Sequence, residues 1–115
     1  MGMAEQLLMS AAAGMAREGV VPFATTYAVF ASRRTYDFIC MAIAGENLYV
    51  KIVCGLPGLT TVYEPSHQAT DDLAIFQVIP NLMIVDPCDG LEIEVRLLAV
   101  SARLLLRNRV TPTFR

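Results

Sequence analysis

Hydrophobic periodicity changes several times along these 115 residues, from helix-like spacing to short apolar runs and back. Changes at such short intervals are typical of βαβ units, in which helices connect parallel strands. We predict helices over Ala4–Glu18, Phe30–Ala44, Ala69–Ile79 and Leu91–Ala99, and strands over Val20–Tyr27, Leu48–Val53 and Leu82–Val85. The segment Leu104–Val110 stays open between a final strand and a continued helix, because periodicity cannot resolve so short an apolar run.

This order of elements predicts an α/β protein with three layers, α/β/α, built on a mainly parallel sheet. Residues 1–115 have the length of one domain with one core, and residues 96–115 are its atypical part. Ligands of open α/β sheets bind where the carboxyl ends of the strands meet. Tyr27, Phe30 and the Gly- and Pro-containing loop Cys54–Gln68 are expected at that edge.

The chain is 55% hydrophobic with a mean hydropathy of +0.49, which excludes a disordered protein. Its longest stretches without a charge, Gly19–Ser32 and Leu73–Val85, each contain a proline and are too short to span a bilayer, so no membrane partner is expected. The first residues lack the basic flank and apolar core of a secretory signal, which favours the cytoplasm. Cys40, Cys54 and Cys88 are then expected to be reduced thiols.

Charge is unevenly distributed along the chain. Residues 1–95 carry four basic and eleven acidic groups, whereas residues 96–115 carry five arginines and no acid. A basic tail can indicate nucleic-acid binding, but these arginines alternate with leucines and lack an aromatic stacking platform. We therefore expect a solvated or inter-subunit surface and no nucleic-acid partner.

Familiar catalytic motifs are absent from the sequence: it has no Gly-rich phosphate loop and no Gly-x-Ser-x-Gly elbow. Three groups remain as candidates. Glu5 is either an exposed first-turn acid or a catalytic group. Tyr27 and Phe30 either pack in the core or form a flat aromatic wall for a ligand. His67 is either a surface residue or a proton donor to a ligand oxygen. No metal site is expected, since only one histidine is available.

Five segments together resemble the pyrimidine-binding domain of transketolases. They are Gly2-Met3-Ala4-Glu5-Gln6, Tyr27-Ala28-Val29-Phe30-Ala31-Ser32, Ser66-His67-Gln68, Ile79-Pro80-Asn81-Leu82 and Val85-Asp86-Pro87. The resemblance extends to about Glu94, lacks the strand that normally precedes the glutamate segment, and so indicates a truncated domain of the thiamine diphosphate-binding fold.

The resemblance implies roles for the candidate residues. Glu5 would hydrogen-bond the N1′ atom of the thiamine diphosphate aminopyrimidine as a protonated carboxyl and thereby activate the cofactor. Tyr27 and Phe30 would form the pocket for the pyrimidine ring, and the third ring position of the family falls near Arg33. His67 would contact the oxygens of sugar phosphate substrates.

The resemblance also implies a partner. The Gly-Asp-Gly…Asn signature that holds Mg²⁺ and the diphosphate is absent here, so a diphosphate-binding transketolase domain or subunit would supply it in a homo- or hetero-oligomer. The leading hypothesis is a subunit or fragment for two-carbon ketol transfer that is inactive alone. The alternatives are a non-catalytic association module and part of a deoxyxylulose phosphate synthase-like enzyme.

Overall fold

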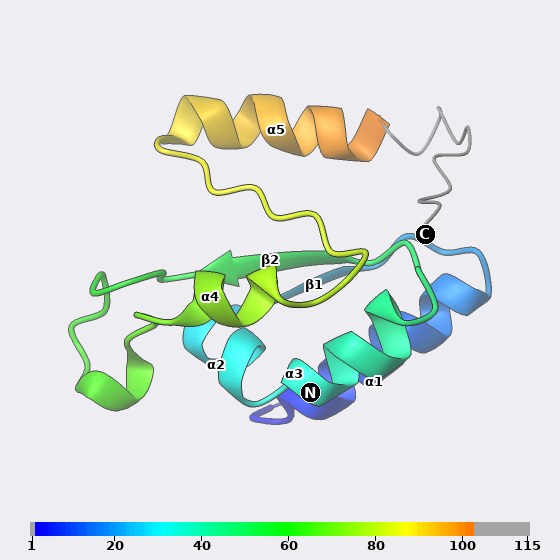
Figure 1. Ribbon diagram of the computed structural model, residues 1–115. Coiled ribbons are helices and arrows are strands. Elements are labelled where there is room, and N and C mark those ends of the chain that lie inside the picture. Colours follow the sequence, from blue (N-terminus) through cyan, green and yellow to red (C-terminus); the bar gives the residue numbers. More distant parts are fainter. Residues whose placement is uncertain (1, 103–115) are drawn as a thin grey trace. The chain divides into compact units, whose positions relative to one another are not determined.

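The computed structural model describes residues 2–102, in two compact units that divide between Ile84 and Val85 (Figure 1). The first unit contains the two strands β1 and β2 and helices α1 to α4, and the second contains helix α5. Segment Leu104–Val110, for which the sequence left a strand and a helix open, lies outside the described residues. None of the helices within residues 2–102 is both long and apolar enough to cross a lipid bilayer.

Helix α1, Glu5–Arg17, forms where the sequence predicts it. Its first turn carries the acidic Glu5 and its last turn the basic Arg17. Both charges interact favourably with the helix dipole and stabilise the helix. Gly19 follows with a φ of +85°, a conformation that glycine adopts without strain and that ends the helix. The buried face of α1 contributes Met9, Ala12 and Ala13 to the core.

Strands β1, Phe23–Tyr27, and β2, Lys51–Gly55, pair in parallel, which confirms the predicted α/β class. Tyr27 is paired with Gly55, so the carboxyl ends of both strands meet at one edge of the sheet. Strand β2 begins later than predicted, because the ladder begins where the Lys51 amide donates to the Pro22 carbonyl at 2.9 Å.

The helix predicted over Phe30–Ala44 is divided into three pieces. These are α2 (Ala28–Arg33), α3 (Tyr36–Phe38) and the π-helical η1 (Ile39–Ala44). The Ser32 hydroxyl donates to the Ala28 carbonyl at 2.8 Å, and the Thr35 hydroxyl donates to the Ala31 carbonyl at 2.5 Å. Side-chain hydroxyls that compete for helix carbonyls in this way bend a helix, and Thr35 leaves the helical conformation with a φ of −120°.

The loop after β2 is closed at its base. Gly58 and Ala69 form an antiparallel bridge through two backbone hydrogen bonds of 2.9 and 3.0 Å, and the loop contains the short 3-10 helix η2, Pro65–His67. Because Ala69 belongs to this bridge, helix α4 begins at Asp72 and extends to Gln77, which is shorter than predicted.

The strand predicted over Leu82–Val85 is wrong, because the sheet within residues 2–102 has two strands. Leu82 and Ile84 contact the core, and Met83 and Val85 are exposed, so the alternating pattern reflects an extended segment without a ladder. Its start is irregular, since Asn81 has a φ of +62° and its side-chain amide donates to the Ala44 carbonyl at 3.1 Å.

The core of the first unit joins α1, β1, α2, η1 and α4. Its buried apolar residues are Met9, Ala12, Ala13, Ala24, Ala31, Ile39, Ile43, Ala44, Phe76 and Ile79. A smaller cluster of Ala28, Val29 and Ala69, against which Phe30 and Cys54 pack, lies at the carboxyl edge of the sheet.

Helix α5, Gly90–Ala102, begins where the sequence predicts it and is capped at its start. The Glu92 amide donates to the Asp89 carboxylate at 2.8 Å, and the Glu92 carboxylate accepts from the Cys88 amide at 3.0 Å. Hydrogen bonds from Cys88 and Arg96 lower the pKa of Glu92 to about 2.

Candidate functional site

Tyr27 and Phe30 lie together at the carboxyl edge of the sheet. Tyr27 is the last residue of β1 and α2 begins at the next residue, so one helical turn separates the two side chains. Their rings are stacked with centroids 5.8 Å apart and an interplanar angle of 14°. The two residues that the sequence singled out are thus adjacent in space and present a flat aromatic surface.

His67 contacts the Phe30 ring from the loop after β2. Its imidazole lies edge-on to Phe30, with ring centroids 5.2 Å apart and an angle of 70°. The Tyr63 and His67 ring centroids lie 5.1 Å apart, and the Ser66 hydroxyl is 2.9 Å from Nδ1 of His67. We refer to Tyr27, Phe30, Tyr63 and His67 as the aromatic cluster. Sequence reasoning missed Tyr63, because its loop has no periodicity that would place it.

Glu5 is buried, with 7% of its surface exposed, although it is the first residue of α1. It lines a hollow of about 210 Å³ together with Gly2, Ala4, Leu8, Thr25 and Thr26. The hollow lies between the first turn of α1 and strand β1. The carboxyl group is therefore sheltered by the fold, in contrast to an ordinary first-turn acid, which projects into water.

Arg34 connects Glu5 to the aromatic cluster. Its Nη1 lies 3.4 Å from Glu5 Oε2, and its guanidinium carbon lies 3.9 Å from the centroid of the Phe30 ring. Sequence reasoning did not select Arg34. The available signal was its position four residues after Phe30, which places both side chains on one face of a helix.

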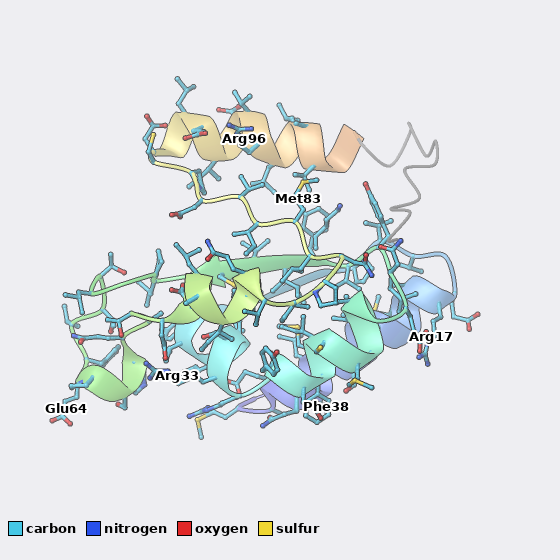
Figure 2. The ribbon with its side chains drawn as sticks, viewed as in Figure 1. Arg17, Arg33, Phe38, Glu64, Met83 and Arg96 are labelled. Carbon is cyan, nitrogen blue, oxygen red and sulfur yellow. The ribbon has the colours of Figure 1, made fainter. Side chains whose placement is uncertain are left out.

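Arg33, the residue at the third ring position, takes a different direction. Its guanidinium pairs with Asp71 at the start of α4, with Nη2 2.9 Å from Oδ1 and Nε 3.1 and 3.2 Å from the two carboxylate oxygens. Figure 2 shows Arg33 on the flank of α2 toward the loop that carries Glu64. This ion pair ties α2 to the segment before α4.

Cys54 lies in β2 beside the site, where it packs against the cluster of Ala28, Val29 and Ala69. Burial, with a smaller contribution from Asp72, raises the pKa of its thiol to about 11. Cys40, Cys54 and Cys88 are free thiols, as the sequence predicted. In the described part of the chain, no three His, Cys, Asp or Glu side chains lie close enough together to hold a metal ion.

Comparison with known families matches residues 1–109 to the model described as "Transketolase, pyrimidine binding domain". The chain belongs to this family. This domain is 70% identical to a transketolase family protein of Sinorhizobium fredii over 102 residues. The matched region covers 89% of this chain and 30% of that protein. The domain is 36% identical over 103 residues to a 1-deoxy-D-xylulose-5-phosphate synthase of Cytophaga hutchinsonii, covering 90% of this chain and 16% of the synthase.

A solved structure titled "Split gene transketolase, inactive beta4 tetramer" has the same fold. It superposes with a TM-score of 0.78 and 39% sequence identity, covering 88% of this domain and 32% of that chain. This chain and that transketolase structure therefore share the fold of the pyrimidine-binding domain. The chain spans a third or less of the length of these relatives.

Proposed function

We propose that this domain supplies the pyrimidine half of a transketolase-type site for thiamine diphosphate. The observation that carries the proposal is the connected arrangement of Glu5, Arg34, Phe30, Tyr27 and His67, which come from α1, α2, β1 and η2. A sheltered carboxyl next to a flat aromatic surface suits an aminopyrimidine, which offers a ring nitrogen for hydrogen bonding and a ring face for stacking.

The residues fit the pyrimidine part of the cofactor. Glu5 would hold a proton at N1′ of the ring, as the family resemblance implies, and Tyr27 and Phe30 would orient the ring by stacking. When bound, thiamine diphosphate supplies a nucleophilic carbon that attacks a ketose carbonyl. His67, whose Nδ1 is engaged with Ser66, would present its other ring nitrogen to a substrate oxygen.

The diphosphate and its Mg²⁺ would be held by a partner, which we propose is a diphosphate-binding transketolase domain or subunit in a shared oligomer. The reaction proposed for the assembly is two-carbon ketol transfer between sugar phosphates, and the location proposed is the cytoplasm.

The test replaces Glu5 by Gln, which keeps the size of the side chain and removes its acidic proton. The variant is mixed with the diphosphate-binding transketolase section of the same genome, thiamine diphosphate and Mg²⁺, and ketol transfer from xylulose 5-phosphate to ribose 5-phosphate is measured. We expect kcat to fall by roughly 10²- to 10⁴-fold, the usual contribution of a positioned proton donor.

The matched control is Glu18→Gln, since Glu18 is an exposed acid at the other end of α1. Glu18→Gln should retain the wild-type rate. Activity that persists in Glu5→Gln at the level of Glu18→Gln would contradict the proposed role of Glu5.

A second candidate reaction is that of a deoxyxylulose phosphate synthase, favoured by the 36% identity to the Cytophaga hutchinsonii enzyme over 90% of this chain. The same mixture decides between the two. Consumption of pyruvate with glyceraldehyde 3-phosphate, in preference to xylulose 5-phosphate with ribose 5-phosphate, would favour the synthase reaction.

A third candidate is a non-catalytic association module. It is favoured by the arginine at the third ring position, since Arg33 pairs with Asp71 and leaves the stack with two aromatic members, Tyr27 and Phe30. Under this hypothesis the mixture assembles but binds no thiamine diphosphate, which isothermal titration calorimetry measures directly.

A further inference from the structure

The Arg34 side chain occupies the position that the aminopyrimidine ring would take in the proposed function. Its guanidinium lies over the Phe30 ring at 3.9 Å from the centroid, while Nη1 reaches Glu5 Oε2 at 3.4 Å. A flat ring that stacked on that side of Phe30 and hydrogen-bonded Glu5 would meet the same two groups. The guanidinium, which is itself planar and a hydrogen-bond donor, therefore covers both contacts at once.

The backbone sets this position. Arg34 is the C-cap residue that follows α2, and its amide donates to the Phe30 carbonyl at 3.2 Å, so its side chain begins one turn beyond Phe30. The side chain is 44% exposed. Water thus adjoins the guanidinium, and a change of rotamer can move it into solvent without moving α2.

The contacts that hold Arg34 are weak. A charge-assisted N–H···O hydrogen bond is commonly about 2.7–2.9 Å long, whereas the Arg34–Glu5 contact is 3.4 Å. Only the Arg34 half of this ion pair is solvated, with side-chain exposures of 44% for Arg34 and 9% for Glu5, and a cation–π contact at an exposed site contributes little to stability. Arg33, by comparison, holds Asp71 through several contacts at 2.9–3.2 Å.

We propose that Arg34 is a displaceable cover for the pyrimidine site. In the free domain it occupies the face of Phe30 and the carboxylate of Glu5, and it moves into solvent when the aminopyrimidine of thiamine diphosphate takes that place. This inference rests on the proposed function. It adds that Arg34 competes with the cofactor ring for the same two contacts, so cofactor binding requires the release of Arg34.

The first test locates Arg34 in the free chain by nuclear magnetic resonance. A guanidinium over a ring face shifts the Arg34 δ and ε protons upfield through the ring current, and Phe30→Leu should abolish that shift. Adding the diphosphate-binding section with thiamine diphosphate and Mg²⁺ should also abolish it. Arg34 protons that keep their upfield shift in the cofactor-loaded wild type would overturn the displacement.

The second test measures cofactor affinity by isothermal titration calorimetry of the same mixture. Arg34→Met keeps most of the apolar stem and removes the charge, and we expect its Kd for thiamine diphosphate to be about fivefold lower, because the contacts to be released are gone. Arg34→Gln should give the same direction. Arg17→Met, which removes an exposed arginine that pairs with Glu46 in the last turn of α1, is the matched control and should leave Kd unchanged.

The outcomes separate this inference from the proposed function. A Kd that is unchanged or higher in Arg34→Met, while the wild type binds and Glu5→Gln weakens binding, overturns the displaceable cover and leaves the proposed function intact. A wild-type mixture that binds no thiamine diphosphate overturns both.

Discussion

The pKa of the Cys54 thiol is determined by the groups packed around it. Cys54 is paired in the sheet with Thr26 and packs against the cluster of Ala28, Val29 and Ala69. Burial of the thiol disfavours its charged form, and the neighbouring Asp72 adds repulsion, so the pKa rises from 9.0 to about 11. The thiolate form is therefore disfavoured in the folded state by the packing of Cys54 against this buried cluster.

This shift predicts a loss of stability in alkali. Between pH 9 and about pH 11 the Cys54 thiol is ionised in the unfolded chain and protonated in the folded chain, so the folded state binds more protons and is destabilised as pH rises. The free energy of unfolding should fall by up to about 2–3 kcal/mol over this range from this group alone.

Urea unfolding at pH 8 to 11 measures this effect. Cys54→Ala should remove this part of the alkaline loss, and Cys88→Ala, which changes an exposed thiol, should retain it. Equal slopes against pH in wild type and Cys54→Ala would show that the thiol does not contribute.

At the scale of elements, the divided helix α2–α3–η1 shapes the site. The break after Arg33 ends α2 soon after Phe30, which is why two consecutive arginines point to different partners, Asp71 and Glu5. The π-helical end of the segment closes at Gly45, whose amide donates to the Cys40 carbonyl at 2.8 Å.

Gly45 should not tolerate a side chain. A Cβ at this position would lie 3.0 Å from the Cys40 carbonyl oxygen and 3.1 Å from that of Met41, and both are backbone atoms that cannot rotate away. We expect Gly45→Ala to lower the free energy of unfolding by about 1–3 kcal/mol through overpacking. Thermal and urea unfolding followed by circular dichroism measure the change.

Gly14 is the matched control for Gly45, because a Cβ there meets nothing within 4 Å and the residue lies inside α1. Gly14→Ala should raise the free energy of unfolding by about 0.5–1 kcal/mol through helix propensity. The two glycine substitutions are thus expected to have opposite signs, and two variants of equal stability would argue against the steric account of Gly45.

At the scale of the whole molecule, we propose that the candidate site supplies only the pyrimidine half of a cofactor site. Glu5 and the aromatic cluster offer contacts for a ring, and nothing in the sequence offers the phosphate-binding signature that a complete site requires. The chain also covers a third or less of the length of the relatives described above.

The expected consequence is that the chain alone does not turn over. With xylulose 5-phosphate, ribose 5-phosphate, thiamine diphosphate and Mg²⁺, purified chain should give no ketol transfer above background, and addition of the diphosphate-binding section should restore it. Transfer by the chain alone at a rate comparable to the mixture would refute the dependence on a partner.

Local pattern alone determined several elements of this protein. Helix α1 and the start of α5 follow from helical periodicity and from residues at their ends, Gly19 after α1 and Asp89 before α5. The parallel pairing of β1 and β2 follows from the helix between them. These features depend on residues close together in sequence, which is why the sequence was sufficient to predict them. The family resemblance singled out Glu5, Tyr27, Phe30 and His67, and their roles stay predictions.

The tertiary structure decided the rest, because contacts between distant residues set it. Whether Leu82–Val85 joins a ladder depends on an adjacent strand, and within residues 2–102 the sheet has two strands. The contact of Arg34 with Glu5 joins residues 29 positions apart, and the loop after β2 brings His67 to Phe30, with Tyr63 beside His67. Periodicity reports which face of an element is apolar and carries no information about which side chain from another element will lie against it.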